Sequence, residues 1–213
     1  MPHAFLRCVF VFVLLFAVAL PVQAQSDYTR TQHPIVLVHG LLGFDSLLGV
    51  YDYWFLIPGE LRAGGARVYV AQVSASHSST VRGEQLVAYL ETLRAIHGHQ
   101  RFNLIGHSHG GPTIRYAASV RPDLVASVTS VGSPHTGSAV ADGIRAGVEP
   151  GSPLESLVAG LVNALSHFIA LLSGNMDPQD ALAALASLDT PGAAAFNALH
   201  PQGLPATARV RLW

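Results

Sequence analysis

The sequence predicts an α/β fold, in which a mostly parallel β-sheet carries helices on both faces. Short runs of β-branched and apolar residues alternate with segments of helical periodicity, which is typical of parallel strands joined by helices. The first run, 35–38, is apolar throughout, as expected of a strand buried on both faces. Glycine-rich turns follow two of these runs directly, at 39–43 and 106–110. Such turns bring the chain sharply from a strand into the next element.

The first half of the chain is expected to supply the sheet. Apolar positions recur at helical spacing in 82–97, and Gly98 ends that pattern. The expected strands are 35–38, 67–73, 102–105 and 125–131, and the expected helices are 51–62, 82–97 and 110–120.

From Ser152 onward the pattern is helical, with no further strand expected. Ser152, Pro153 and Glu155 fit a capping box with proline at the first helical position, and apolar residues then recur every three or four positions to 172. Asp177-Pro178 and Thr190-Pro191 are expected to open two more short helices in the same way. We therefore expect a helical region at about 152–199.

Composition excludes several classes of function. With 213 residues the chain is long enough for one domain, and its formal net charge of -1 gives no reason to expect nucleic-acid binding. The residues are 50% hydrophobic and 12% charged. All 12 basic residues are arginine. Without lysine, a P-loop, a Schiff-base enzyme and a serine-lysine hydrolase are excluded.

Residues 1–24 are expected to be a cleaved signal peptide, followed by one domain at 25–213. Arg7 precedes an apolar stretch at 8–20, which is shorter than the roughly 20 residues of a membrane-spanning helix, and 22–24 resembles a cleavage site. We therefore expect a secreted protein. The only cysteine, Cys8, lies in this segment, so the exported domain is expected to have no disulfide.

Ser108 is the candidate nucleophile. It lies between Gly106 and Gly110, directly after an apolar run, in the pattern Gly-X-Ser-X-Gly. In a strand-turn-helix unit this pattern presents the serine hydroxyl at the carboxyl end of a parallel strand, as a nucleophile elbow. A hydroxyl needs a histidine base and an acid that orients it, so the pattern predicts an acyl hydrolase with two such partners elsewhere.

The turn after the first run is the candidate oxyanion loop. In His39-Gly40-Leu41-Leu42-Gly43, the backbone N–H of Leu41 is expected to point at the mouth of the elbow. Together with the backbone N–H of His109 it would stabilise the negative oxygen of a tetrahedral intermediate. The side chains of His39, His107 and His109 are expected to be structural, because no metal-binding spacing accompanies them. No metal site is predicted.

At these positions the chain resembles the secreted bacterial triacylglycerol lipases of the Pseudomonas and Burkholderia type, from about residue 28 to about residue 206. The resemblance implies an α/β-hydrolase fold and hydrolysis of long-chain acylglycerols through an acyl-enzyme at Ser108. It also implies a structural calcium ion and a membrane-anchored foldase as partner. The motifs that carry it are 39–45, 53–55, 81–86, 103–116 and 121–124.

The resemblance places the triad aspartate and histidine, the calcium ligands and a disulfide in a segment beginning shortly after 201–203. The chain instead continues into the basic tail 209–213, which we interpret as the product of a frameshift or early stop, with the C-terminal strands missing and the strand at 125–131 left as an open edge. No triad acid or base is identified. The candidates in the correct chain order are Asp123, Asp142, Asp177, Asp180, Asp189, His135, His167 and His200, and none follows a recognisable further strand. Asp177 and Asp189 are interpreted as cap or turn residues, His167 as the polar side of a helix and His200 as a helix-end residue.

The apolar stripe of the helix at 152–172 allows two interpretations. It could pack in the core, or it could form a lid that covers the site in water and opens on a lipid surface, with Leu157, Leu161, Leu165 and Phe168 facing substrate. The resemblance favours the lid. Two other functions stay open: a non-catalytic fragment that binds lipid or the foldase, and an esterase for short or polymeric esters.

Overall fold

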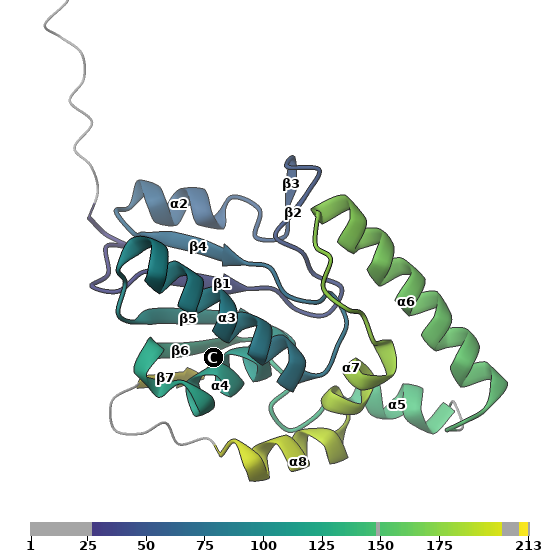
Figure 1. Ribbon diagram of the computed structural model, residues 1–213. Helices are drawn as coiled ribbons and strands as arrows, with labels where there is room; N and C mark the ends of the chain where they lie inside the picture. Colours follow the sequence, from purple (N-terminus) through teal and green to yellow (C-terminus); the bar gives the residue numbers. More distant parts are fainter. Residues whose placement is uncertain (1–26, 148–149, 202–208, 213) are drawn as a thin grey trace, which may run out of the picture.

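The computed structural model (Figure 1) describes residues 27–147, 150–201 and 209–212. The expected signal peptide at 1–24 lies outside these residues. A five-stranded sheet of order β4-β1-β5-β6-β7 forms the centre, and every neighbouring pair is parallel. Its strands are β1 (Ile35–Val38), β4 (Val68–Ala71), β5 (Phe102–His107), β6 (Val125–Val131) and β7 (Arg209–Leu212). The predicted parallel sheet is confirmed.

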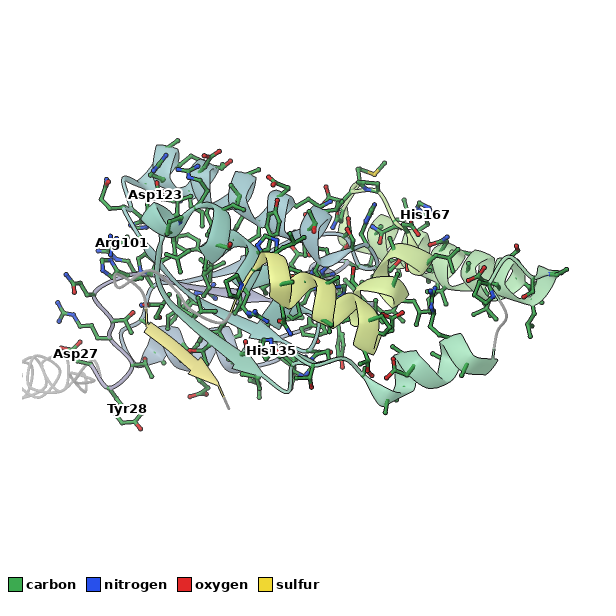
Figure 2. All side chains as sticks on the ribbon, turned by 90° about the horizontal axis from the view of Figure 1, so that it is seen from below. Asp27, Tyr28, Arg101, Asp123, His135 and His167 are labelled. Carbon is green, nitrogen blue, oxygen red and sulfur yellow. The ribbon has the colours of Figure 1, made fainter. Side chains whose placement is uncertain are left out.

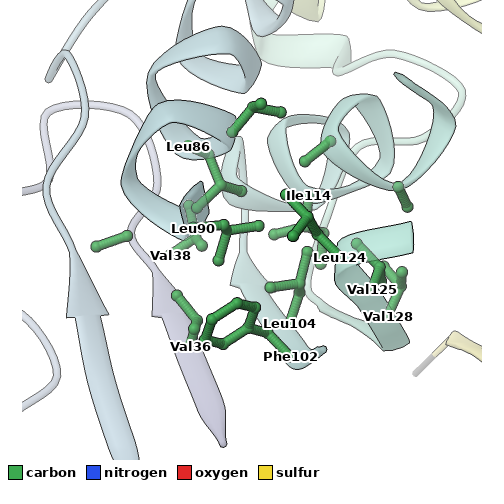
Figure 3. Close-up of a cluster of buried hydrophobic side chains, with 14 of the residues drawn as sticks. Val36, Val38, Leu86, Leu90, Phe102, Leu104, Ile114, Leu124, Val125 and Val128 are labelled. Carbon is green, nitrogen blue, oxygen red and sulfur yellow. The ribbon is translucent and has the colours of Figure 1, made fainter. Parts of the chain in front are cut away.

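Helices cover both faces of the sheet, as predicted. On one face, α3 (Ser79–His97) and α4 (Gly110–Val120) enclose a core that includes Leu86, Leu90 and Ile114 (Figure 3). On the other face, α2 (Ile57–Ala63) covers a smaller cluster around Trp54. Because β1 lies between both clusters, all four of its residues are buried, which explains its unbroken apolar run.

The helical region lies beside the carboxyl ends of the strands (Figure 1). It begins with α5 (Ala139–Gly147), which the sequence did not predict, and continues through α6 (Pro153–Ser173), α7 (Ala181–Leu188) and α8 (Thr190–Leu199). The predicted cap of α6 is confirmed, because the Ser152 hydroxyl accepts a hydrogen bond from the Glu155 N–H at 3.1 Å. A short 3-10 helix (Pro122–Leu124) leads from α4 into β6.

The helix expected at 51–62 is wrong in its first half. Ser46–Leu47 (β2) and Tyr51–Asp52 (β3) form a small antiparallel hairpin instead. Gly49, with φ at +68°, permits its tight turn. The helix starts only at Ile57, because Pro58 lacks an N–H and so fits the first helical turn.

The helix expected to open at Asp177-Pro178 starts later, at Ala181. The Pro178 carbonyl accepts a hydrogen bond of 2.6 Å from the Ser74 hydroxyl, so this segment is tied to the loop after β4 before the helix begins. Asp180 is the actual cap and accepts from the Ala183 N–H at 2.9 Å. The helix at Thr190-Pro191 is confirmed, with Asp189 as its cap.

The basic tail forms β7, which pairs with β6 from Ser127 to Ser130. The expected open edge along β6 is therefore wrong, as is the expectation of no strand after Ser152. Residues 209–212 alternate arginine with an apolar residue, the period of two typical of a strand. This alternation was the feature from which the strand could have been predicted.

Candidate active site

A sharp turn joins β5 to α4 and carries Ser108 at its apex. Ser108 has φ at +52°, in the left-handed region where a residue other than glycine is strained by about 1–3 kcal/mol. Two hydrogen bonds of 2.9 Å hold it there: its N–H donates to the Val131 carbonyl, and its carbonyl accepts from the Gly111 N–H. The turn thus has the geometry that the sequence pattern predicts for a nucleophile elbow.

Two glycines allow this turn because the chain passes itself too closely for a side chain. A Cβ atom at Gly106 would lie 2.3 Å from the Gly110 carbonyl oxygen. A Cβ atom at Gly110 would lie 2.3 Å from the Val38 carbonyl oxygen on β1. Both distances are far below van der Waals contact, so the strand and helix can meet only at glycine.

The loop after β1 lies against the turn that carries Ser108. A Cβ atom at Gly40 would be 2.9 Å from the Ser108 Cβ, so the two glycine-rich motifs meet in space as expected. Leu41 follows directly and is partly exposed, whereas the neighbouring Leu42 N–H is bound to the Ala75 carbonyl at 2.7 Å. Within the described residues, the backbone N–H groups of Leu41 and His109 have no acceptor in the protein. Both are therefore free to bind an oxygen atom of a ligand.

The histidines around the turn have structural contacts. His39 is fully buried; its Nδ1–H donates to the Gly40 carbonyl at 2.9 Å. Burial, with a smaller effect of the Arg82 charge, lowers the pKa of His39 to about 3. The same causes hold the pKa of His109 well below its usual value, and its Nε2 contacts the Ser79 hydroxyl at 3.0 Å. His107 Nδ1 accepts a hydrogen bond from the Tyr53 hydroxyl.

No candidate base is placed against Ser108: among the described residues, no imidazole forms a hydrogen bond with its hydroxyl. His135 follows β6 and so lies at the carboxyl ends of the strands, as does the turn that carries Ser108. Its Nδ1, however, contacts the Arg115 guanidinium at 3.2 Å, and burial and that charge lower its pKa. His167 is exposed on α6, and His200 ends α8 with its Nδ1 3.0 Å from the Ser119 hydroxyl.

The candidate acids are also engaged elsewhere. Asp123 precedes β6, so it lies at the amino-terminal ends of the strands, whereas Ser108 lies at their carboxyl ends. Asp123 pairs with Arg121 at 2.8 Å. Figure 2 shows Asp123 and His167 at opposite ends of the molecule, with His135 between them. Asp142 accepts from Thr190, Asp177 lies in a turn, and Asp180 and Asp189 cap helices.

The described parts of the chain contain no candidate set of metal ligands. No group of three or more His, Cys, Asp or Glu side chains is placed there to hold an ion. The calcium ion that the resemblance implies cannot be assigned to these residues.

An apolar pocket of about 180 Å³ opens beside Leu41, between α5, α6 and α7. From α6 it is lined by Val158, Ala159 and Val162. The four predicted lid residues do not line it. They lie on another side of α6 and face solvent, with 46–73% of each residue exposed: Leu157, Leu161, Leu165 and Phe168. Only 17% of the most apolar stretch of α6 is buried, which is against the core-packing interpretation. Periodicity alone could not show which side of the stripe faces the protein.

Comparison with known proteins agrees with this geometry. A family profile for the alpha/beta hydrolase fold matches residues 33–198. The chain belongs to the alpha/beta hydrolase family.

Curated relatives of this hydrolase include three bacterial proteins named triacylglycerol lipase. The chain is 58% identical to the one from Vibrio cholerae, with 87% of this chain and 59% of that protein aligned. The relatives from Pseudomonas fragi and Burkholderia plantarii are 47% and 43% identical, over 84% of this chain and 61% and 51% of theirs. The chain thus spans a little over half the length of these relatives.

Solved structures support the fold. A lipase from Bacillus licheniformis superposes with a TM-score of 0.60 at 20% identity, over 84% of this hydrolase and 64% of that chain. A metagenomic carboxyl esterase gives a TM-score of 0.59 at 20% identity, over 84% and 48% of the respective chains.

Proposed function

We propose that this hydrolase cleaves acylglycerol esters through an acyl-enzyme at Ser108. One observation carries the proposal: the strained Ser108 lies against the Gly40 loop, beside two backbone N–H groups that have no acceptor among the described residues. A hydroxyl next to two unpaired donors fits attack on an ester carbonyl, because the donors stabilise the oxygen that becomes negative.

In this mechanism the Ser108 oxygen adds to the ester carbonyl, and the N–H groups of Leu41 and His109 bind the resulting oxyanion. Collapse of the tetrahedral intermediate releases the alcohol and leaves the acyl group on Ser108. Water then repeats the addition and releases the fatty acid. A base must accept the Ser108 hydroxyl proton and then give it to the departing alcohol oxygen, and no described residue is assigned to that role.

The substrate class follows from two apolar surfaces. The pocket is lined mainly by apolar side chains and includes Leu41, whose N–H is one of the two donors, so it suits an acyl group. The exposed stripe on α6, with Leu161 73% and Phe168 57% exposed, suits contact with a lipid surface and supports the lid role of this helix. Relatives named triacylglycerol lipase point to the same substrate.

Three further properties remain proposals from the resemblance to secreted lipases. They are export with removal of 1–24, folding assisted by a membrane-anchored foldase, and a structural calcium ion. No step of the mechanism above uses them. A calcium titration followed by the thermal unfolding midpoint tests the last: an increase in the midpoint supports it, and an unchanged midpoint contradicts it.

An esterase for shorter esters is the second candidate. The pocket volume of about 180 Å³ lies below the roughly 300–1,000 Å³ typical of sites for drug-sized ligands, which favours a short acyl group unless α6 moves. Hydrolysis rates along a series from butyrate to palmitate esters distinguish the two. A maximum at butyrate supports the esterase, and a maximum at longer chains on emulsified substrate supports the lipase.

Labelling with a fluorophosphonate tests Ser108 directly. We expect stoichiometric modification of the parent chain and none of Ser108→Ala. Ser119→Ala is the matched control, since Ser119 lies on the exposed end of α4, and should label like the parent. If neither phosphonate labelling nor ester hydrolysis depends on Ser108, the catalytic proposal fails and a non-catalytic lipid- or foldase-binding role takes its place.

A further inference from the structure

A fully buried arginine lies behind the candidate oxyanion loop. Arg82 on α3 has no exposed surface, and no carboxylate within the described residues pairs with it. Burial lowers the pKa of Arg82 to about 9, so the guanidinium is still charged at neutral pH. Burying an unpaired charge destabilises a fold strongly unless its N–H groups are bound, so its hydrogen bonds indicate what it does.

Arg82 binds three separate segments. Its Nη2 donates to the His39 carbonyl at 2.6 Å, at the start of the oxyanion loop. Its Nε donates to the Thr113 hydroxyl at 3.2 Å, and its Nη1 to the Ser74 carbonyl. The Thr113 hydroxyl in turn donates to the His109 carbonyl at 2.8 Å. One side chain thus reaches the His39 carbonyl directly and the His109 carbonyl through a single hydroxyl.

These contacts fix the backbone on both sides of the site. The peptide that joins His39 to Gly40 is held at both ends, its carbonyl by Arg82 and its N–H by the Tyr53 hydroxyl at 3.1 Å. The next peptide carries the Leu41 N–H, and its carbonyl is held by His39 Nδ1. Because each peptide unit is planar, the bond from His39 Nδ1 to the Gly40 carbonyl sets the direction of the Leu41 N–H. Arg82 fixes the peptide just before that one and, through Thr113, the peptide just after the His109 N–H.

We propose that Arg82 is a positioning residue that holds the two oxyanion donors, the N–H groups of Leu41 and His109, in a fixed mutual arrangement. The proposal rests on the function assigned above to this loop. Arg82 does not touch the substrate. Lysine cannot replace it, because an ammonium group lacks the planar fork of donors that reaches three directions at once.

Hydrogen exchange of the free protein tests this arrangement without requiring activity. In Arg82→Lys we expect amide exchange to rise about tenfold or more in both 39–43 and 107–111, since each segment loses a charge-assisted hydrogen bond or its relay. Arg115→Lys is the matched control, because Arg115 is also buried but binds Asn197 and the His200 carbonyl. Loss of these two hydrogen bonds should raise amide exchange in 190–200 instead. An increase spread evenly over the sheet, or no increase in 39–43, overturns the proposal.

Thr113→Val provides a second variant if Arg82→Lys does not fold. It removes only the relay, so exchange should rise in 107–111 and stay unchanged in 39–43. A rise in both segments, or in neither, contradicts the relay.

Kinetics then connect this geometry to the reaction. Where the parent shows Ser108-dependent hydrolysis, Arg82→Lys should lower kcat about 100-fold with KM unchanged, as for loss of an oxyanion donor. An unchanged kcat in a folded variant overturns the positioning role. If the parent shows no Ser108-dependent hydrolysis, the proposed function fails on its own, and the exchange experiment still decides whether Arg82 orders both loops.

Discussion

Replacing Gly106 by alanine tests whether the close passage of β5 and α4 is as tight as the structure indicates. The added Cβ would lie 2.3 Å from the Gly110 carbonyl oxygen and 2.4 Å from its carbon. Carbon atoms in contact are about 3.5–4.0 Å apart, so the strand and the helix must separate by about 1 Å. Backbone atoms cannot avoid the clash by changing rotamer. We therefore expect a destabilisation of about 2–3 kcal/mol, in the upper part of the range for overpacking.

Urea unfolding measures this change, followed by far-UV circular dichroism and by fluorescence of the buried Trp54. A loss of about 2 kcal/mol corresponds to a thermal midpoint lower by roughly 4–8 °C for a chain of this size. Gly59→Ala is the matched control, because nothing lies within 4 Å of its added Cβ on α2. There we expect a gain of up to about 1 kcal/mol. A Gly106→Ala protein within 0.5 kcal/mol of the parent would refute the reasoning.

Three further predictions concern α6 and the buried histidines. Leu161→Asp on the exposed side of α6 should change the free energy of unfolding by less than about 0.5 kcal/mol. It should nevertheless reduce binding to triolein emulsions. A clear loss of stability would contradict the exposure of Leu161 to solvent. Ser152→Ala removes the cap of α6 and should destabilise that helix by about 1 kcal/mol, measured as faster amide exchange confined to 153–173. Burial lowers the pKa values of His39 and His109 in the folded protein below their ordinary value of about 6.5. As the pH falls below 6.5, these histidines therefore take up protons in the unfolded chain but not in the folded protein, and the free energy of unfolding decreases. Between pH 6.5 and 5 the loss from His39 is about 2 kcal/mol, and His109 adds a loss of the same sign. Urea midpoints that stay constant over this interval would contradict it.

The sheet was predictable because its physical causes lie in neighbouring residues. A strand buried on both faces needs a continuous apolar run, and Ile35–Val38 was predicted from such a run. Val125–Val131, which mixes β-branched and small polar residues, was also predicted with the bounds that the structure shows. Gly110–Val120 was predicted equally well, since it follows the glycine-rich turn directly. The cap at Ser152 depends only on residues three positions apart and was also correct.

The errors occurred where distant segments decide the local structure. The segment at Asp177 is bound by the Ser74 hydroxyl, about a hundred residues earlier, so its local helix pattern did not apply. β7 depends on the edge of β6, and its alternating pattern was too short to outweigh an unusual composition. The burial of Arg82 was also missed, because a lone arginine in a helical pattern does not indicate burial.

Local chemistry determined the residues of the candidate site: glycines where the chain passes itself, a serine at the bend between them, and a second glycine-rich turn after the first strand. The tertiary structure decided that Gly40 and Ser108 lie against each other, that Arg82 holds the His39 carbonyl, and that the pocket beside Leu41 is lined by Val158 and not by Leu157. A glycine requirement is set by backbone geometry within a few residues, whereas these contacts join segments far apart in the chain and exist only once the sheet has brought them together.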